Sequence, residues 1–165
     1  MSSFNTPPRR LADLIRPHKV LIPPPEPIIV APKRPNFIPA SWSWHPEDQI
    51  IRPPMGPFDP TKMRLYLSPQ QKGKNDISGT DLSVELKGLP VLGADDLDRL
   101  LAEPYLIPDS WKSKRTFFWG DIYRRPAGTL CVHYLEWGVD RWRRDYDWLD
   151  SGWWNANRPA AVCSS

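Results

Sequence analysis

The chain has 165 residues, of which 40% are hydrophobic and 25% charged, a composition that predicts one folded domain, or one domain with a tail. The formal net charge of +3 is compatible with an acidic partner but is no evidence for one, because an arm that wraps nucleic acid usually carries a denser stripe of Lys and Arg. Two cysteines make no disulfide framework. Because neither a secretory signal nor a stretch of ~18 apolar residues is present, we expect a cytoplasmic protein without a membrane span.

Composition changes near residue 63. Fifteen of the 21 prolines lie in residues 1–62, and seven of the nine tryptophans follow residue 110. The excess positive charge also lies in the first part, because residues 63–165 hold fourteen basic and fourteen acidic side chains. We therefore predict a proline-rich extended arm over residues 1–62 and a small α+β domain over residues 63–165.

A short amphipathic helix is predicted at residues 6–17 of the arm. Thr6 is its expected N-cap, Pro7 takes the first helical position and Pro17 ends it. Its apolar face consists of Leu11, Leu14 and Ile15. A helix of this length is marginal in water, so we expect it where this face docks on another surface. A disordered tail is the alternative.

Residues 20–39 alternate large apolar side chains with prolines. Proline at this density excludes helix and favours polyproline II. Ordinary disordered linkers are poor in large apolar residues, so we expect this segment to lie against its own domain or against a partner. Besides the helix face, the expected contact residues are Leu21, Ile22, Pro24, Ile28, Ile29, Phe37, Trp42 and Trp44.

Two short helices are predicted in the first part of the domain. A short strand at residues 63–67 and an open loop at 68–79 precede the first helix, which Thr80 caps and which runs to about Lys87. The second helix, over residues 94–103, places leucines on one stripe and aspartates in its first turn, where the helix dipole favours them.

Three strands rich in aromatic and β-branched residues follow, at residues 116–123, 130–137 and 141–149. Short turns between them imply an antiparallel meander. The predicted fold is therefore α+β, with two short helices followed by a three-stranded antiparallel meander. Side-chain alternation gives the third strand one aromatic face, which consists of Trp142, Tyr146 and Trp148.

The motifs of these strands occur in a distinctive order. They are Phe-Phe-Trp-Gly at 117–120, Ile-Tyr-Arg at 122–124, Leu-Cys-Val at 130–132, Tyr-Leu at 134–135 and Trp-Leu-Asp at 148–150. Over about residues 64–162 this pattern resembles a family of small uncharacterised bacterial domains. The resemblance implies a domain and no particular activity. His133 and Arg144 depart from the arginine and aromatic residues expected at those positions, and the arm lies outside the resemblance.

Residues suited to catalysis are few. The histidines and cysteines lack the spacing of zinc ligands, so we expect no metal or cofactor. Cys131 and His133 share a strand face, as a nucleophile and its base would. A reactive thiolate also needs an electropositive niche and an orienting third group. We therefore interpret the pair as structural, with a buried thiol beside a partly exposed imidazole.

Three carboxylates, Asp145, Asp147 and Asp150, are candidates for acid–base work or cation binding. Asp145 and Asp147 alternate with arginines on one strand, and ion pairs on a solvated face explain them well. The sequence contains no glycine-rich phosphate loop and no Gly-x-Ser-x-Gly motif. We therefore expect a protein that is not an enzyme.

Binding is the function that the composition favours. The tryptophans and tyrosines after residue 110 exceed what a small core readily buries, although helices covering the sheet could use them as core. An accessible aromatic groove binds polyproline II segments, unstacked bases or sugars. We expect a structural subunit that anchors to a protein partner or to a neighbouring subunit of a homo-oligomer through its arm. The alternative is a nucleic-acid-associated protein, for example ribosome-bound, that uses an aromatic and arginine-bearing sheet face.

Overall fold

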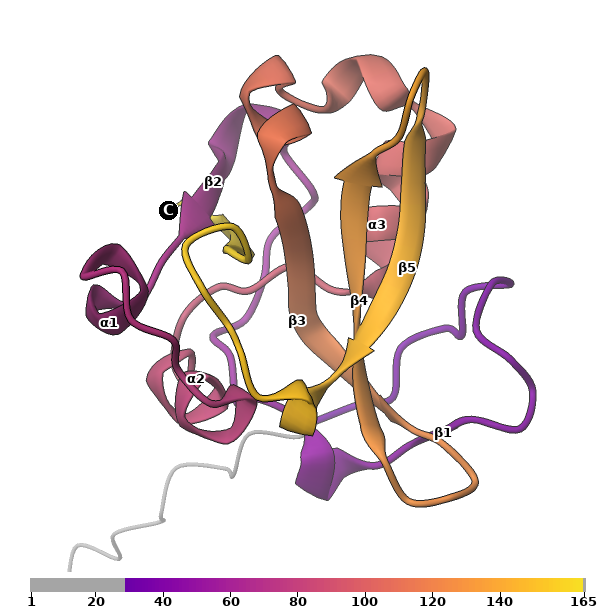
Figure 1. Cartoon of the computed structure of the whole chain (residues 1–165). Helices are drawn as coiled ribbons and strands as arrows, with labels where there is room; N and C mark the ends of the chain where they lie inside the picture. Colours follow the sequence, from indigo (N-terminus) through magenta and orange to yellow (C-terminus); the bar gives the residue numbers. More distant parts are fainter. Residues whose placement is uncertain (1–28, 165) are drawn as a thin grey trace, which may run out of the picture.

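Strands of mixed direction form the centre of the structure, a computed structural model that describes residues 29–164 (Figure 1). The strand order is β2-β6-β3-β4-β5, with β1 also paired to β3. The strands are β1 Ser43–Trp44, β2 Met63–Tyr66, β3 Arg115–Arg124, β4 Leu130–Trp137, β5 Trp142–Trp148 and β6 Ala160–Cys163. The α-helices are α1 Pro69–Lys72, α2 Gly79–Glu85 and α3 Ala94–Ala102.

The central strand β3 changes partner along its length. Its pairing with β4 is interrupted between Phe117 and Ile122. On its other edge, Phe117 pairs with Ala160 of β6 in parallel, whereas Tyr123 pairs with Trp44 of β1 in antiparallel orientation. The strand therefore joins the C-terminus and the arm to the same sheet.

The prediction of a three-stranded antiparallel meander after two helices is wrong. The strands at 115–124, 130–137 and 142–148 are present, but they belong to a six-stranded mixed sheet, and α1 lies inside the predicted open loop. β1 and β6 are only two and four residues long, and long-range pairing to β3 defines them more than local propensity does. The sequence does contain a local indication of α1 that the prediction overlooked, because Ser68 and Gln71 form a capping box around Pro69.

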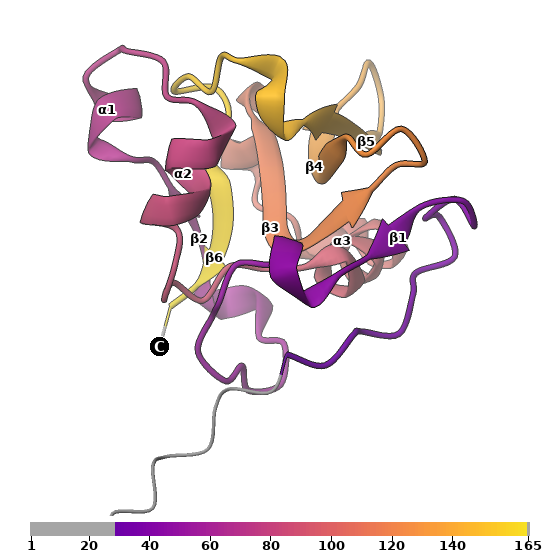
Figure 2. The ribbon, with the colours of Figure 1, turned by 90° about the horizontal axis from the view of Figure 1, so that it is seen from below.

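Alternate residues of β3 face two hydrophobic cores, one on each side of the sheet. The ring centroids of Phe117 and Trp119 lie 4.4 and 4.9 Å from that of Trp154, in the core that includes Leu82 of α2. Phe118 belongs to the second core, with the leucines of α3. Figure 2 shows α2 and α3 on different sides of β3. Both faces of this part of the sheet are therefore covered.

The outer edge of β5 is blocked by its own aspartates. Gly138 donates to the Arg141 carbonyl across the two-residue turn, a register in which the amides of Tyr146 and Trp148 point away from β4. Each of these amides donates to the preceding carboxylate, Asp145 Oδ1 or Asp147 Oδ1, at 2.8 Å. The aspartates therefore occupy donors that a further strand would need.

Removing these carboxylates is expected to promote self-association. In a variant with Asp145→Ala and Asp147→Ala, the two outward amides are free to pair with the edge of another molecule. We expect light scattering to show aggregation at protein concentrations where the unchanged chain stays dispersed. Asp140→Ala, in the neighbouring turn, is the control and should have no such effect; equal aggregation of the control would contradict this explanation.

Candidate functional site

The predicted contact residues of the arm fall into two groups. Ile29, Phe37, Trp42 and Trp44 are described by the structure. The others lie outside the described residues, and they are Leu11, Leu14, Ile15, Leu21, Ile22, Pro24 and Ile28. The division at residue 63 and the contact role of these residues therefore stay predictions.

The middle of the arm packs on the aromatic face of β5. Trp42 is only 7% exposed, and its ring centroid lies 4.8 Å from that of Tyr146 and 5.7 Å from that of His133. Phe37 lies 5.2 Å from His133, with the Arg144 guanidinium 4.2 Å above its ring. The sequence left open whether the arm binds its own domain or another, and here this part lies against its own.

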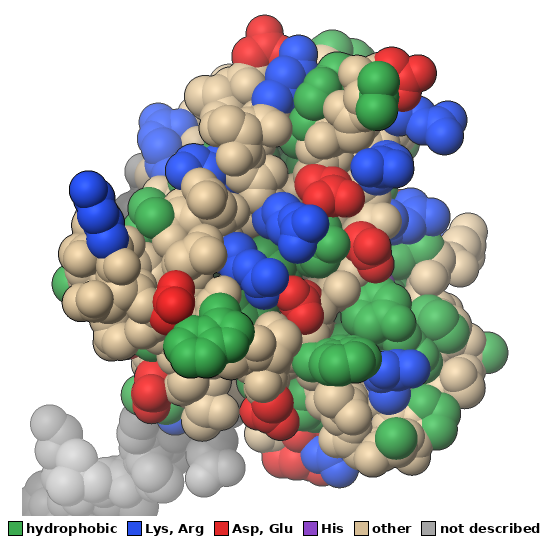
Figure 3. All heavy atoms as spheres, viewed as in Figure 1, with side chains coloured by type: hydrophobic (Ala, Val, Ile, Leu, Met, Phe, Trp, Pro, Cys, Tyr) green, Lys and Arg blue, Asp and Glu red, His purple; other side chains and the backbone are tan. Residues whose placement is uncertain are grey.

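The other two residues of the predicted aromatic face have different surroundings. Trp142 packs edge-on against Trp137, with centroids 5.3 Å apart. Trp148 remains 47% exposed and lies 5.9 Å from the Arg125 guanidinium, which is also 5.8 Å from the Tyr146 ring. Figure 3 shows hydrophobic side chains gathered around a basic group on this side of the molecule. The aromatic face is therefore partly core and partly accessible.

Two adjoining clefts open where the arm crosses the first turn of α3. The larger has a volume of about 1020 Å³ and the smaller about 390 Å³. Both are walled by prolines of the arm, and both reach Met55, Arg52 and Asp121. The sequence gives no local pattern for these clefts, because their walls come from proline-rich loops, and they were therefore not predicted.

Asp121 holds three segments together at the base of these clefts. Its carboxylate accepts hydrogen bonds from Trp44 Nε1 at 3.1 Å and from the Ala94 amide at 2.8 Å, so it joins β1 and the start of α3 to β3. Only 3% of Asp121 is exposed. Burial raises the pKa of this carboxyl to about 6, against the opposing effects of these hydrogen bonds and of Arg52.

Two glycines leave room for this arrangement. A Cβ atom on Gly93 would collide with Asp121 Oδ2, and one on Gly120 would lie 2.5 Å from Arg52 Nη1. Arg52 itself donates to the Val91 carbonyl at 2.8 Å. The sequence does indicate this site through Asp121, because a charged residue within an otherwise apolar and aromatic strand needs buried polar partners.

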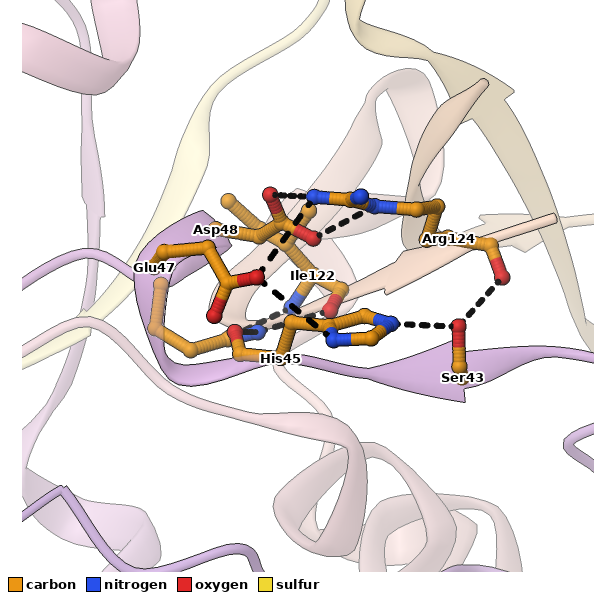
Figure 4. A network of polar contacts seen from close by, with 7 residues as sticks. Ser43, His45, Glu47, Asp48, Ile122 and Arg124 are labelled. Atoms are coloured by element: carbon orange, nitrogen blue, oxygen red, sulfur yellow. Dashed lines mark hydrogen bonds and ion pairs between the residues drawn. The ribbon is translucent and has the colours of Figure 1, made fainter. Parts of the chain in front are cut away.

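A polar network fixes the beginning of β1 and the following turn on β3 (Figure 4). Arg124 donates to both carboxylate oxygens of Asp48, at 3.0 and 2.6 Å, in a bidentate pair. Gln49 exchanges two hydrogen bonds of 2.9 Å with the backbone of Ile122. These contacts continue the sheet through side chains beyond the two-residue strand β1.

Within this network, Ser43, His45 and Glu47 have the order of a hydrolytic triad. Ser43 Oγ lies 2.8 Å from His45 Nε2, and His45 Nδ1 lies 3.6 Å from Glu47 Oε1. However, neither large cleft is lined by Ser43 or His45, and Ser43 Oγ also contacts the Arg124 carbonyl at 3.4 Å. We interpret the three residues as part of the attachment of the arm, since a nucleophile also needs a bound substrate and oxyanion donors.

The pair formed by Cys131 and His133 is poorly suited to nucleophilic catalysis. Burial raises the pKa of Cys131 to about 11, whereas a catalytic thiol needs a lowered value. His133 is only 4% exposed, not the partly exposed imidazole that the sequence suggested. Burial lowers its pKa to about 4. Neither ring nitrogen has a well-oriented hydrogen bond, although proximity to the Asp145 backbone favours the protonated ring.

The other candidates show no converging site. Asp147 forms an ion pair of 2.6 Å with Arg158, and Asp150 lies in a short turn after β5. Among the described residues, no group of three or more His, Cys, Asp or Glu side chains is arranged to hold a metal ion. In the same part of the chain, no helix is long and apolar enough to cross a membrane.

Comparisons with known proteins add no relative. Neither family models nor curated proteins match the sequence, and no solved structure matches the fold. The resemblance to a family of small bacterial domains therefore stays a prediction.

Proposed function

We propose that the protein is a non-enzymatic interaction subunit that anchors to a protein partner through its proline-rich arm. One observation carries this proposal. Three large apolar side chains of the described arm stay exposed, Val30 at 75%, Ile51 at 50% and Met55 at 37%, and all three line the smaller cleft. Exposed apolar side chains gathered around a hollow are typical of a docking surface.

The rest of the arm supports this interpretation by contrast. Ile38, Trp42 and Ile50 are no more than 7% exposed, so the arm already buries the apolar residues that its own domain can accept. The remaining apolar surface is held in place by Asp121 and by the Arg124 network, which reduces the entropy lost when a partner binds. A partner that offers an apolar segment would complete this surface.

Introducing negative charge at the smaller cleft is expected to weaken the assembly with the partner. In the full chain, Val30→Glu with Ile51→Glu places two carboxylates in the docking surface, and because both side chains are exposed, the fold should persist. We expect native mass spectrometry of the complex, purified together with its bound partner, to show at least a roughly tenfold loss of the assembled state, since each buried charge is strongly unfavourable at an interface.

The matched control is Val84→Glu with Val139→Glu, which changes two exposed valines away from the clefts. It should leave the assembly intact. The proposal is wrong if the cleft variant assembles as well as the control. Deleting the whole arm is a weaker test, because Trp42 and Ile50 belong to the packed cores.

A second candidate function rests on the Arg125 and Trp148 surface. An exposed indole beside a guanidinium can stack nucleic-acid bases. Binding of single-stranded RNA that weakens steeply as salt is raised would favour this function. Binding that is absent at low salt would remove it.

A further inference from the structure

The larger cleft has a chemistry that matches one segment of this chain. Its walls carry four carboxylates, from Asp59, Asp95, Asp96 and Asp121, against the two basic groups of Arg52 and Lys62. Its remaining surface is largely apolar, with Met55 and Phe58 among the prolines. A cleft of this kind favours a segment that combines apolar side chains with positive charge.

Residues 6–19 have this combination. They hold four basic residues, Arg9, Arg10, Arg16 and Lys19, against one acidic residue, Asp13. The three apolar residues at 11, 14 and 15 share one face if the segment is helical. We propose that residues 6–19 of one copy of the chain dock in the acidic cleft of a second copy, an inference that rests on the proposed anchoring function and names its partner.

The spacer between this segment and the described arm favours a second copy over the same chain. The described residues begin with Ile29 at the rim of the smaller cleft, beside the proposed docking site. Residues 20–28 contain four prolines and no glycine. A polyproline II spacer of this length extends for roughly 28 Å at ~3.1 Å per residue. If residues 20–28 adopt this conformation, they would carry residues 6–19 past the adjoining cleft of their own chain and toward a neighbouring molecule.

Cys163 provides a native probe of the cleft. It lines the larger cleft and is only partly buried, whereas Cys131 is fully buried. The alkylation rate with iodoacetamide therefore reports mainly on Cys163. If a second copy covers the cleft, we expect the rate to fall roughly fivefold when the full chain is concentrated to ~80% association, because only the open cleft reacts.

Two variants of the docking segment should abolish this protection. One carries Arg9→Glu, Arg10→Glu and Arg16→Glu, and the other carries Leu11→Ser, Leu14→Ser and Ile15→Ser, which leaves the charge unchanged. We expect both to be monomers by light scattering, with alkylation rates independent of concentration. High salt should mimic the first variant, because it screens charges at the contact.

A charge exchange tests the contact itself. Asp95 is exposed on the rim of the cleft, so Asp95→Lys should release Cys163, whereas Asp140→Lys, in the turn after β4, should not. Combining Asp95→Lys with the three glutamates of the first segment variant should restore both the protection and the dimer. A change that merely disturbed the fold would not be rescued in this way.

The outcomes separate this inference from the proposed function. Protection that is independent of concentration overturns it, because the segment then covers its own chain. Equal reactivity of the unchanged chain and both segment variants at every concentration also overturns it. In either case the variant with Val30→Glu and Ile51→Glu still tests the anchoring function. It changes the smaller cleft, and its readout is loss of the complex with the partner.

Discussion

Replacing Asp121 by alanine is expected to lower the free energy of unfolding by about 2–6 kcal/mol, the sum for two buried donors that lose their acceptor. The loss has two sources. Trp44 Nε1 and the Ala94 amide both lose their acceptor, and a buried donor without a partner costs about 1–3 kcal/mol. Urea-induced unfolding at about pH 4 measures the change, because there the folded-state carboxyl is protonated and no cost of burying its charge offsets the lost hydrogen bonds. We also expect β1 to detach first, because Trp44 is its contact with Asp121.

The Asp121→Asn variant separates the charge from the hydrogen bonds. Because burial raises the pKa of Asp121 from 3.8 to about 6, the folded state binds a proton more tightly than the unfolded state. The stabilisation is fully present below pH 3.8 and is lost as pH rises toward 6, and a shift of about two units corresponds to roughly 3 kcal/mol. Asparagine should remove this dependence while keeping one of the two hydrogen bonds.

The Asp121 prediction has a clear opposing result. If Asp121→Ala unfolds at the same urea concentration as the unchanged chain, the carboxylate does not hold β1 and α3 to the sheet. Asp98→Ala is the control, since Asp98 is an exposed residue of α3 whose nearest basic group, on Arg144, lies 3.8 Å away. Surface pairs of this kind contribute about 0–1 kcal/mol.

Local patterns located the strands of the central sheet because these strands are long and their connections short. Residues 130–137 were predicted and observed as β4 with the same bounds. Helix α2 begins at Gly79 and is capped by Ser78, two residues before the predicted cap Thr80. The extent of the sheet could not be read in this way, because β6 consists of Ala-Ala-Val-Cys and becomes a strand only by pairing with β2 and β3.

The candidate site was harder to predict than the fold. Aromatic alternation identified the face of β5 but not its cover, because the contact of Trp42 with Tyr146 joins positions more than a hundred residues apart. The exposed residues Val30 and Ile51 look no different in sequence from the buried Ile38 and Ile50. Burial depends on where the arm turns, and the Arg124 and Asp121 contacts fix those turns.

The titration of His133 changes the stability of the protein in the opposite direction to that of Asp121 over the same range of pH. Burial lowers the pKa of His133 from 6.5 to about 4, so the folded state binds its proton less tightly than the unfolded state. The stabilisation is present above pH 6.5 and is lost as pH falls toward 4. Between about pH 4 and 6, the titration of Asp121 lowers the free energy of unfolding as pH rises, whereas that of His133 raises it. The two effects therefore largely cancel in the unchanged chain. Substituting either residue should reveal the effect of the other.

Replacing His133 by phenylalanine is therefore expected to stabilise the protein, by about 2 kcal/mol at pH 5 from the lost titration alone. The ring lies among Phe37, Trp42, Tyr123 and Tyr146, where an apolar aromatic side chain needs no hydrogen bond. Arg144 and the Asp145 carboxylate are the charged groups facing it, and neither loses a well-oriented partner. Thermal unfolding between pH 4 and 8 measures the effect. A His133→Phe variant that is less stable than the unchanged chain at pH 5 would contradict this prediction and show that the imidazole has a partner in solution.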